Sequence, residues 1–213
     1  MPTRLSRQEN QARTRACLLE SATRIFARRG LAHASIEEVA QDAGFTKGAF
    51  YANFASKEEL FLAMLDERFA ERLAEIDRVL ATEEDPERQT HRAGVDFVQY
   101  LSADPEWQRL FFEFAAHASR HEDFRQALLL RYRRLRERIA GIYEQRLGRL
   151  DVAAPIPVAD IALMTFAMAN GVALEQLVEP EAVTEELYGR MLAIFFAGLR
   201  SMIDATAAVP AAE

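Results

Sequence analysis

Residues 30–60, GLAHASIEEVAQDAGFTKGAFYANFASKEEL, contain the pattern that decides the fold. Within this stretch, residues 35–38 (SIEE) have the form of a capping box. The Ser35 hydroxyl can accept a hydrogen bond from the backbone N–H of Glu38, whose side chain can reach back to the start of the helix. We therefore predict a short helix that begins after Ser35 and ends at Gly44.

A second short helix is predicted directly after this glycine turn. Thr46 can cap it, and Phe50 and Phe54 fall on its inner face because they lie four residues apart. Residues 56–59 (SKEE) repeat the cap and begin a longer helix. Two short capped helices joined by a tight turn with glycine form a helix-turn-helix, whose second helix enters the major groove of DNA.

The second of these helices has a surface that suits DNA. Its first residues, Lys47-Gly48-Ala49, combine one cation with two very small side chains, so the backbone can approach DNA while base edges stay accessible. Tyr51 follows the inward-facing Phe50, so its hydroxyl can meet a phosphate. The helix N-termini at Ser35 and Ser56 offer backbone N–H groups and a favourable dipole to phosphate oxygens.

The rest of the chain is predicted to be helical, because no stretch alternates apolar and polar residues for long. A first helix is expected from about Thr14 to Arg29, with Gly30 at its C-terminal cap. Two strongly apolar helices are expected at the end of the chain, over residues 158–178 and about 184–203. The sequence thus predicts an all-α fold of about nine helices, three of them small and N-terminal.

The charge is distributed unevenly along the chain. The net charge of −7 argues against a nucleic-acid binder until it is divided. Residues 1–57 contain nine Arg or Lys against five Asp or Glu, a net charge of +4, which leaves −11 for the remainder. Cationic side chains supply much of the affinity for DNA, and an acidic body favours an orientation with the N-terminal part toward the duplex. Charge alone leaves open that this excess is surface scatter.

Several other classes of protein do not fit the sequence. The single cysteine, Cys17, excludes an internal disulfide and a cysteine-built metal site. The N-terminus has no apolar segment typical of a secretory signal. Polar residues interrupt the most apolar stretch, residues 161–177, so we expect a buried helix and no membrane span. Together these observations lead us to expect a cytoplasmic protein. We find no nucleophile motif and no glycine-rich phosphate loop, so we expect no catalytic residues and no cofactor.

On the residues of the helix-turn-helix, the chain resembles the TetR family of bacterial transcriptional regulators. The resemblance covers roughly residues 14 to 65. It implies a homodimer whose two recognition helices read successive major grooves of a palindromic operator in double-stranded DNA. It also implies an N-terminal DNA-binding domain, residues 1–58, and a C-terminal domain, residues 59–213, that dimerises and holds a small-molecule effector.

The resemblance also implies roles for individual residues of the helix-turn-helix. The expected phosphate contacts are Ser35, Thr46, Tyr51 and Lys57. The expected base-facing set is Lys47, Gly48, Ala49, Ala52 and Asn53.

An apolar ligand cavity is a further expectation, because aromatic and methionine side chains adapt to irregular ligands. The candidates are Phe97, Tyr100, Trp107, Phe111, Phe114, Met164 and Met168, with His117 and Asn170 as polar anchors. Stripes at helical spacing are more often plain core, so a cavity and a solid core both stay open as interpretations. His117 and His121 have the spacing of two metal ligands, but a helix break and the lack of a third ligand favour histidines at a surface or pocket rim.

The last two helices are apolar around most of their circumference, yet few later elements remain to cover them. A twofold contact with a second copy would bury them, and the candidates for this interface are Met191, Phe195, Phe196 and Leu199. The alternative is a monomer in which both helices are central to the core.

Two functions fit the sequence. The first is a ligand-responsive regulator of transcription, a repressor that a small apolar ligand releases from DNA. The second is a small-molecule-binding or scaffolding protein whose helix-turn-helix no longer engages DNA. The intact Lys47, Tyr51 and Lys57 favour the first.

Overall fold

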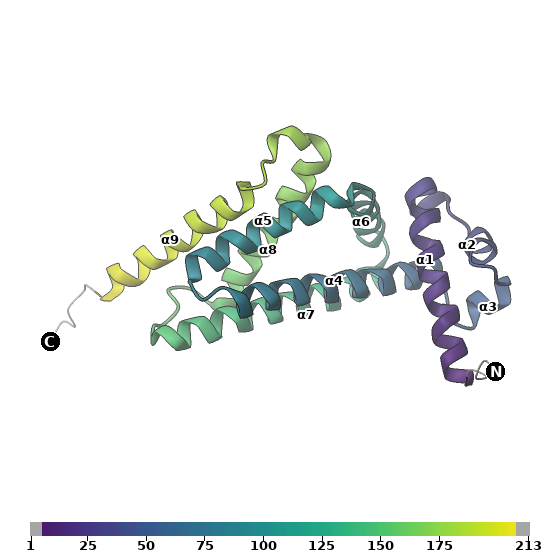
Figure 1. The fold of residues 1–213 in the computed structure, drawn as a ribbon, viewed down its shortest axis with the longest axis horizontal. Coiled ribbons are helices and arrows are strands. Elements are labelled where there is room, and N and C mark those ends of the chain that lie inside the picture. The colour runs from purple at the N-terminus through teal and green to yellow at the C-terminus, as the bar shows by residue number, and fades with distance from the viewer. Residues whose placement is uncertain (1–5, 208–213) are drawn as a thin grey trace. The chain divides into compact units, whose positions relative to one another are not determined.

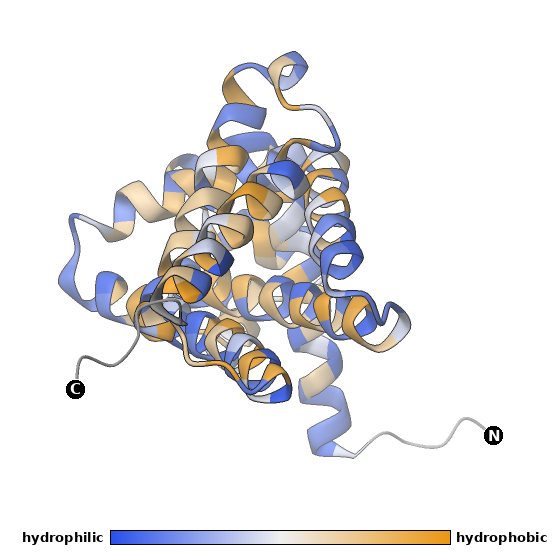
Figure 2. Ribbon diagram, turned by 90° about the vertical axis from the view of Figure 1, so that its left-hand side faces the viewer, coloured by the Kyte–Doolittle hydropathy of each residue, from blue (hydrophilic) through white to orange (hydrophobic). Residues whose placement is uncertain are grey.

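The structure is a computed structural model that describes residues 6–207. These residues form nine α-helices and one short 3-10 helix and contain no strand, which confirms the all-helical prediction (Figure 1). The α-helices are α1 (Arg7–His33), α2 (Ile36–Asp42), α3 (Lys47–Tyr51), α4 (Lys57–Thr82), α5 (Pro86–Ala103), α6 (Pro105–Ala118), α7 (Glu122–Leu150), α8 (Val158–Val178) and α9 (Leu187–Ala207). In Figure 2, hydrophobic and hydrophilic residues alternate around the helices, as expected for amphipathic helices that bury one face.

Contacts group the chain into two compact units. The first unit contains the residues up to Glu71 together with Arg109–Leu129, and the second contains Arg72–Gln108 and the residues from Leu130 onward. Helices α4, α6 and α7 therefore contribute to both units. The division of the chain into domains of residues 1–58 and 59–213 stays a prediction.

The first unit contains a core of apolar side chains from α1, α2, α3 and α4. On α1, Leu18, Ala22 and Phe26 share one face at helical spacing, and all three are buried. The buried Ser21 hydroxyl donates to the Val39 carbonyl oxygen at 2.8 Å, which fixes α2 against α1. The aromatic ring of Phe61, on α4, stacks on the ring of Phe114, on α6, with ring centroids 4.2 Å apart.

Helix α1 begins earlier than the predicted start at Thr14. Ser6 caps it, because the Ser6 hydroxyl accepts from the backbone N–H of Glu9 at 3.2 Å and the Glu9 carboxylate accepts from the Ser6 N–H. This capping box, residues 6–9 (SRQE), has the same form as the one at residues 35–38, so the sequence contained the signal.

In the second unit, α5 and α9 cross at two glycines. A Cβ atom added to Gly94 would lie 2.4 Å from the Cα of Gly189, so the two backbones are in direct contact. Next to this crossing, the rings of Tyr188 and Phe97 pack with centroids 5.0 Å apart. The Tyr188 hydroxyl donates to the Thr165 carbonyl oxygen at 2.9 Å, which connects α9 to α8.

Helix α8 is buried along one face only. By length and composition this helix could cross a membrane, and 28% of its apolar 18-residue stretch is buried inside the protein. Its exposed face carries Leu163, Leu174 and Val178, and Val178 is 74% exposed. On α9, Ile194 is 69% exposed. One copy of the chain thus leaves apolar faces of both terminal helices in water, in contrast to the buried helix predicted for residues 161–177.

We predict that Gly94→Ala destabilises the protein by about 2 kcal/mol or more, because the added methyl group meets backbone atoms that cannot move aside. Gly141→Ala, on α7, is the matched control. No atom lies within 4 Å of the Cβ that this change adds, and alanine favours a helix by about 1 kcal/mol over glycine. Urea unfolding followed by circular dichroism measures both changes. Equal stabilities of the two variants would contradict the close crossing of α5 and α9.

Candidate nucleic-acid interface

The caps predicted for α2 and α3 are present. The Ser35 hydroxyl accepts from the Glu38 N–H at 3.1 Å, and the Glu38 carboxylate accepts from the Ser35 N–H at 3.0 Å. The Thr46 hydroxyl oxygen accepts from the Ala49 N–H at 3.2 Å. Between the helices, Gly44 has a φ of +77°, which favours glycine over any residue with a side chain. These contacts produce the two short helices and the tight turn of a helix-turn-helix.

The outer face of α3 is open to solvent. Lys47, Gly48 and Ala52 are exposed, Tyr51 is 52% exposed, and the adjacent Phe50 is fully buried. Among the residues that the structure describes, none forms a hydrogen bond or ion pair with the Lys47 ammonium group. This face therefore presents one free cation, one phenol and very small side chains.

Asn53 does not share this outward orientation. Its side-chain Nδ2 donates to the Ala49 carbonyl oxygen at 2.8 Å, and its Oδ1 is buried without a hydrogen-bond partner among the described residues. The guanidinium of Arg15 lies over the Phe54 ring, 4.2 Å from its centroid, and its Nη1 donates to the Asn53 carbonyl oxygen at 3.5 Å. Asn53 is thus folded back on α3, which differs from the base-facing orientation expected from the sequence.

A shallow hollow of about 450 Å³ lies beside α3. It brings together four of the expected DNA-contacting residues, and Ser56 at the start of α4 lines it too. The residues that line it are Ala34, Ser35, Ile36, Glu37, Lys47, Tyr51, Ala55, Ser56, Lys57 and Glu58. The N-terminus of α4, with its backbone N–H groups and positive dipole end, opens at this hollow, an arrangement that favours an anion.

Lys57 occupies this region in a way that the sequence did not predict. Its ammonium group donates to the carbonyl oxygens of Leu31 at 2.7 Å, Ala32 at 3.1 Å and Ala34 at 3.4 Å. An ammonium group has three N–H donors, so these carbonyls engage all of them. A phosphate contact, as expected from the sequence, would have to share the ammonium group with the end of α1.

Lys57 binds carbonyl oxygens of the turn at the end of α1, residues 30–34. Glu113, on α6, binds N–H groups of the same turn. The Glu113 carboxylate accepts from the backbone N–H groups of Leu31 at 3.1 Å and Ala32 at 2.8 Å. Gly30 begins the turn with a φ of +71°, and a Cβ there would lie 2.9 Å from the carboxylate. We call this arrangement of Lys57, Glu113 and residues 30–34 the Lys57 clasp. Sequence reasoning missed Glu113 because no local pattern relates it to a turn so distant in the chain.

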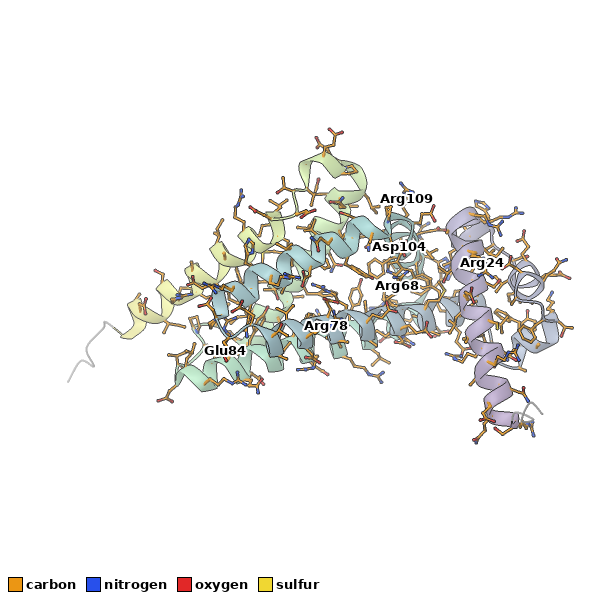
Figure 3. The ribbon with its side chains drawn as sticks, viewed as in Figure 1. Arg24, Arg68, Arg78, Glu84, Asp104 and Arg109 are labelled. Atoms are coloured by element: carbon orange, nitrogen blue, oxygen red, sulfur yellow. The ribbon has the colours of Figure 1, made fainter. Side chains whose placement is uncertain are left out.

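Ion pairs between α1 and α2 neutralise two of the three acidic residues of α2, Glu38 and Asp42. Arg24, labelled in Figure 3, contacts Asp42 at 2.8 Å, and Arg29 contacts Glu38 at 2.8 Å. Hydrogen bonding from Arg24 lowers the pKa of Asp42, and hydrogen bonding from Ser35 lowers the pKa of Glu38. Both carboxylates stay charged at neutral pH but are paired, so they repel a nearby anion less.

Known proteins match both ends of the chain. The family model "Bacterial regulatory proteins, tetR family" matches residues 18–64, and the model "BetI-type transcriptional repressor, C-terminal" matches residues 86–204. The chain belongs to the TetR family. The chain is 31% identical over 163 residues to the HTH-type transcriptional repressor SCO4008 of Streptomyces coelicolor, covering 74% of this chain and 77% of that protein.

A further relative in sequence and a solved structure support the same family. An uncharacterized HTH-type transcriptional regulator of Bacillus subtilis, YfiR, is 27% identical over 173 residues, covering 78% of this chain and 80% of that protein. The crystal structure of a putative transcriptional regulator from Pseudomonas aeruginosa has the same fold, with a TM-score of 0.75 at 17% identity over 93% of this chain and 94% of that one. The protein is therefore a TetR-family DNA-binding transcriptional regulator.

The residues expected to line a ligand cavity fall into both units of this TetR-family chain. Phe111, Phe114 and His117 belong to the first unit, where Phe114 is fully buried against Phe61. The others belong to the second unit: Phe97, Tyr100, Trp107, Met164, Met168 and Asn170. Met164 is 45% exposed beside Leu163 on the open face of α8, so it differs from the cavity-lining residue expected.

The two histidines are stacked, with the ring centroids of His117 and His121 4.4 Å apart. The His117 Nε2 lies 3.8 Å from the Glu58 carboxylate, and no third ligand joins them. Within residues 6–205, no group of three or more His, Cys, Asp or Glu side chains could hold a metal ion.

The Lys57 clasp generates a prediction about stability without DNA. Lys57→Met should lower the free energy of unfolding by about 1–3 kcal/mol, because three carbonyl oxygens lose a charged donor. Lys47→Met removes the only other lysine of the chain, and its side chain is exposed, so its effect should stay within about 0.5 kcal/mol. Urea unfolding of both variants makes the comparison. Equal stability of the two would show that Lys57 has no structural role.

Proposed function

We propose that the protein is a cytoplasmic homodimeric repressor that binds a palindromic operator through α3 and releases it when a small molecule binds. The observation that carries this proposal is the outer face of α3 beside the 450 Å³ hollow. Small side chains allow a close approach to base edges there, while a free lysine and a helix N-terminus offer positive charge to phosphates. No enzymatic step is part of this proposal.

The geometry refines the roles expected from the sequence. We assign Lys47, Tyr51 and the start of α4 to phosphates around the hollow, together with Ser35 and Thr46, whose hydroxyl oxygens already cap helices. Gly48, Ala49 and Ala52 are assigned to the surface that faces base edges. Asn53 and Lys57 are assigned to positioning, because their polar atoms bind the protein backbone.

We further propose that a second copy of the chain covers the open faces of α8 and α9. Along α8, five of the exposed positions form one stripe at helical spacing: Leu163, Ala167, Gly171, Leu174 and Val178. Ala167 and Gly171 in the middle of the stripe would let another helix approach closely. In a twofold dimer, this stripe would pack against the same stripe of the second copy, as in the four-helix contacts of many dimers.

On α9, Ile194 is the most exposed large apolar side chain and lies one residue before the expected Phe195, and Met202 is exposed as well. Leu199 is buried inside the protomer, and Met191, Phe195 and Phe196 are partly buried. The Phe196 ring packs on Tyr143 with centroids 5.4 Å apart. The proposed interface is therefore centred on Ile194 in place of Leu199.

The DNA contacts can be separated by their salt dependence. Lys47→Met should reduce the slope of log affinity against log salt by about one unit per half-site, because one cation no longer releases counterions. Tyr51→Phe should weaken binding without changing this slope, since it removes a neutral hydrogen bond. Titration of an operator duplex at several salt concentrations measures both. Arg28→Met, which removes an exposed cation of α1 outside the hollow, is the control.

Unchanged affinity in both α3 variants would contradict this assignment. It would favour the second function, a ligand-binding or scaffolding protein that does not engage DNA.

A charged residue placed at the centre of the proposed dimer interface tests the dimer. Ile194→Glu should yield folded monomers and weaken operator binding strongly, because two carboxylates would be buried face to face. Leu150→Glu, at an exposed apolar position on α7, should remain dimeric. Analytical ultracentrifugation at micromolar concentration distinguishes the two states. A wild-type protein that sediments as a monomer, or an Ile194→Glu variant that stays dimeric, would refute this interface.

A further inference from the structure

Arg72 lies on α4 at the beginning of the second unit, and its guanidinium is turned into that unit. Its side chain is partly buried. One terminal nitrogen, Nη2, donates to the Ala93 carbonyl oxygen of α5 at 3.0 Å. The guanidinium carbon lies 5.1 Å from the centroid of the Phe97 ring. These two contacts hold the guanidinium in place but supply no negative charge.

No carboxylate within residues 6–205 lies within ion-pairing distance of Arg72. Glu75 and Asp96 are the acidic residues whose charges act on it. Each of them is bound to another arginine, since Arg78 contacts Glu75 at 2.9 Å and Arg92 contacts Asp96 at 2.8 Å. The charge of Arg72 is thus left without a partner of its own, although acidic residues are near.

Such an arrangement has an energetic cost. A guanidinium has five N–H donors and stays charged in a protein, and here one of them donates to the Ala93 carbonyl oxygen. Removal of water lowers the pKa of Arg72 below its usual value. Arginine is rarely buried without a counter-charge, because desolvation of the charge is not repaid by an ion pair. An arginine kept in this state is a candidate for binding an anion from outside the protein.

Aromatic rings also lie beside the guanidinium. Phe97 packs on the ring of Tyr188, whose hydroxyl already donates to the Thr165 carbonyl oxygen. Burial raises the pKa of Tyr188, so it remains neutral. Because the Tyr188 hydroxyl is engaged within the protein, Phe97 and Tyr188 offer mainly apolar ring atoms to a molecule beside Arg72.

We propose that the effector is an organic acid with an apolar body, and that its carboxylate pairs with the guanidinium of Arg72. This inference rests on the proposed function only in that the bound acid acts as an effector. A carboxylate matches the planar fork of a guanidinium and can accept two parallel hydrogen bonds. A cationic ligand would be repelled by Arg72, and a neutral one would leave its charge unpaired.

The test uses the full-length protein and three probes of equal chain length: decanoate, decanol and decyltrimethylammonium. Isothermal titration calorimetry should detect binding of decanoate to the wild type. In Arg72→Met, which keeps an unbranched side chain like the stem of arginine but removes the guanidinium, decanoate should bind roughly 10- to 100-fold more weakly, as expected for the loss of charged hydrogen bonds. Decanol should bind the wild type and this variant equally.

Arg138→Met is the matched control. Arg138, on α7, has an exposed side chain paired with Asp77, and Asp77 is not among the acidic residues whose charges act on Arg72. This variant should bind decanoate like the wild type. Without ligand, Arg72→Met should melt at the same or a higher temperature than the wild type, because an unpaired buried charge has been removed.

The inference is overturned if Arg72→Met binds decanoate as tightly as the wild type, or if decanol or decyltrimethylammonium binds the wild type more tightly than decanoate. It is also overturned if no acid from hexanoate to tetradecanoate, nor phenylacetate, binds the wild type. A lower melting temperature of Arg72→Met would show that the guanidinium is structural. Failure of the wild type to bind any operator would refute the proposed function but not the carboxylate site, which calorimetry decides by itself.

Discussion

Helices α2 and α3 contain seven and five residues, and isolated helices of this length are not stable in water. Their geometry depends on the burial of Val39, Phe50 and Phe54 in the core of the first unit. Caps at Ser35 and Thr46 satisfy the first N–H groups of each helix, and the glycine turn allows both apolar faces to meet the same core. Every proposed contact with DNA depends on this constraint, since the recognition surface is the outer side of a helix that only its inner side stabilises.

The Lys57 clasp extends the same constraint to the end of α1. The turn at residues 30–34 has its carbonyl oxygens bound by Lys57 and two of its N–H groups bound by Glu113. A lysine that the sequence assigns to phosphate therefore fixes where α4 begins relative to α1. Since α4 starts beside the proposed phosphate hollow, a structural role of Lys57 and the DNA-binding geometry are connected.

Local signals account for most of what the sequence predicted correctly. Capping boxes, glycine turns and apolar spacing located the helices. The start of α1 was placed too late although its own capping box was present, and α9 begins and ends a few residues later than predicted. The orientation of Asn53, the clasp and the exposure of Ile194 in place of Leu199 could not be predicted in this way. Each depends on contacts between distant segments or on the rotation of a helix by less than one turn. A small error in the predicted rotation of a helix about its axis exchanges a buried side chain for an exposed one.

Two cations have no bound carboxylate among the residues that the structure describes: Lys47 on the outer face of α3 and Arg72 within the second unit. We propose an anion for each, the phosphates of a duplex for Lys47 and a small acid for Arg72, in a chain with a net charge of −7. Stability alone does not explain Arg72, since removing an unpaired buried charge is commonly neutral or favourable. Lys47 is exposed, so its removal should change stability little.

In vitro selection from random duplex DNA with the whole chain tests whether two copies of α3 read DNA as a symmetric pair. We expect enrichment of an inverted repeat whose half-sites are centred about one helical turn apart, roughly 10 base pairs or a small multiple. Enrichment of a single asymmetric site, or no enrichment over a protein-free control, would contradict it.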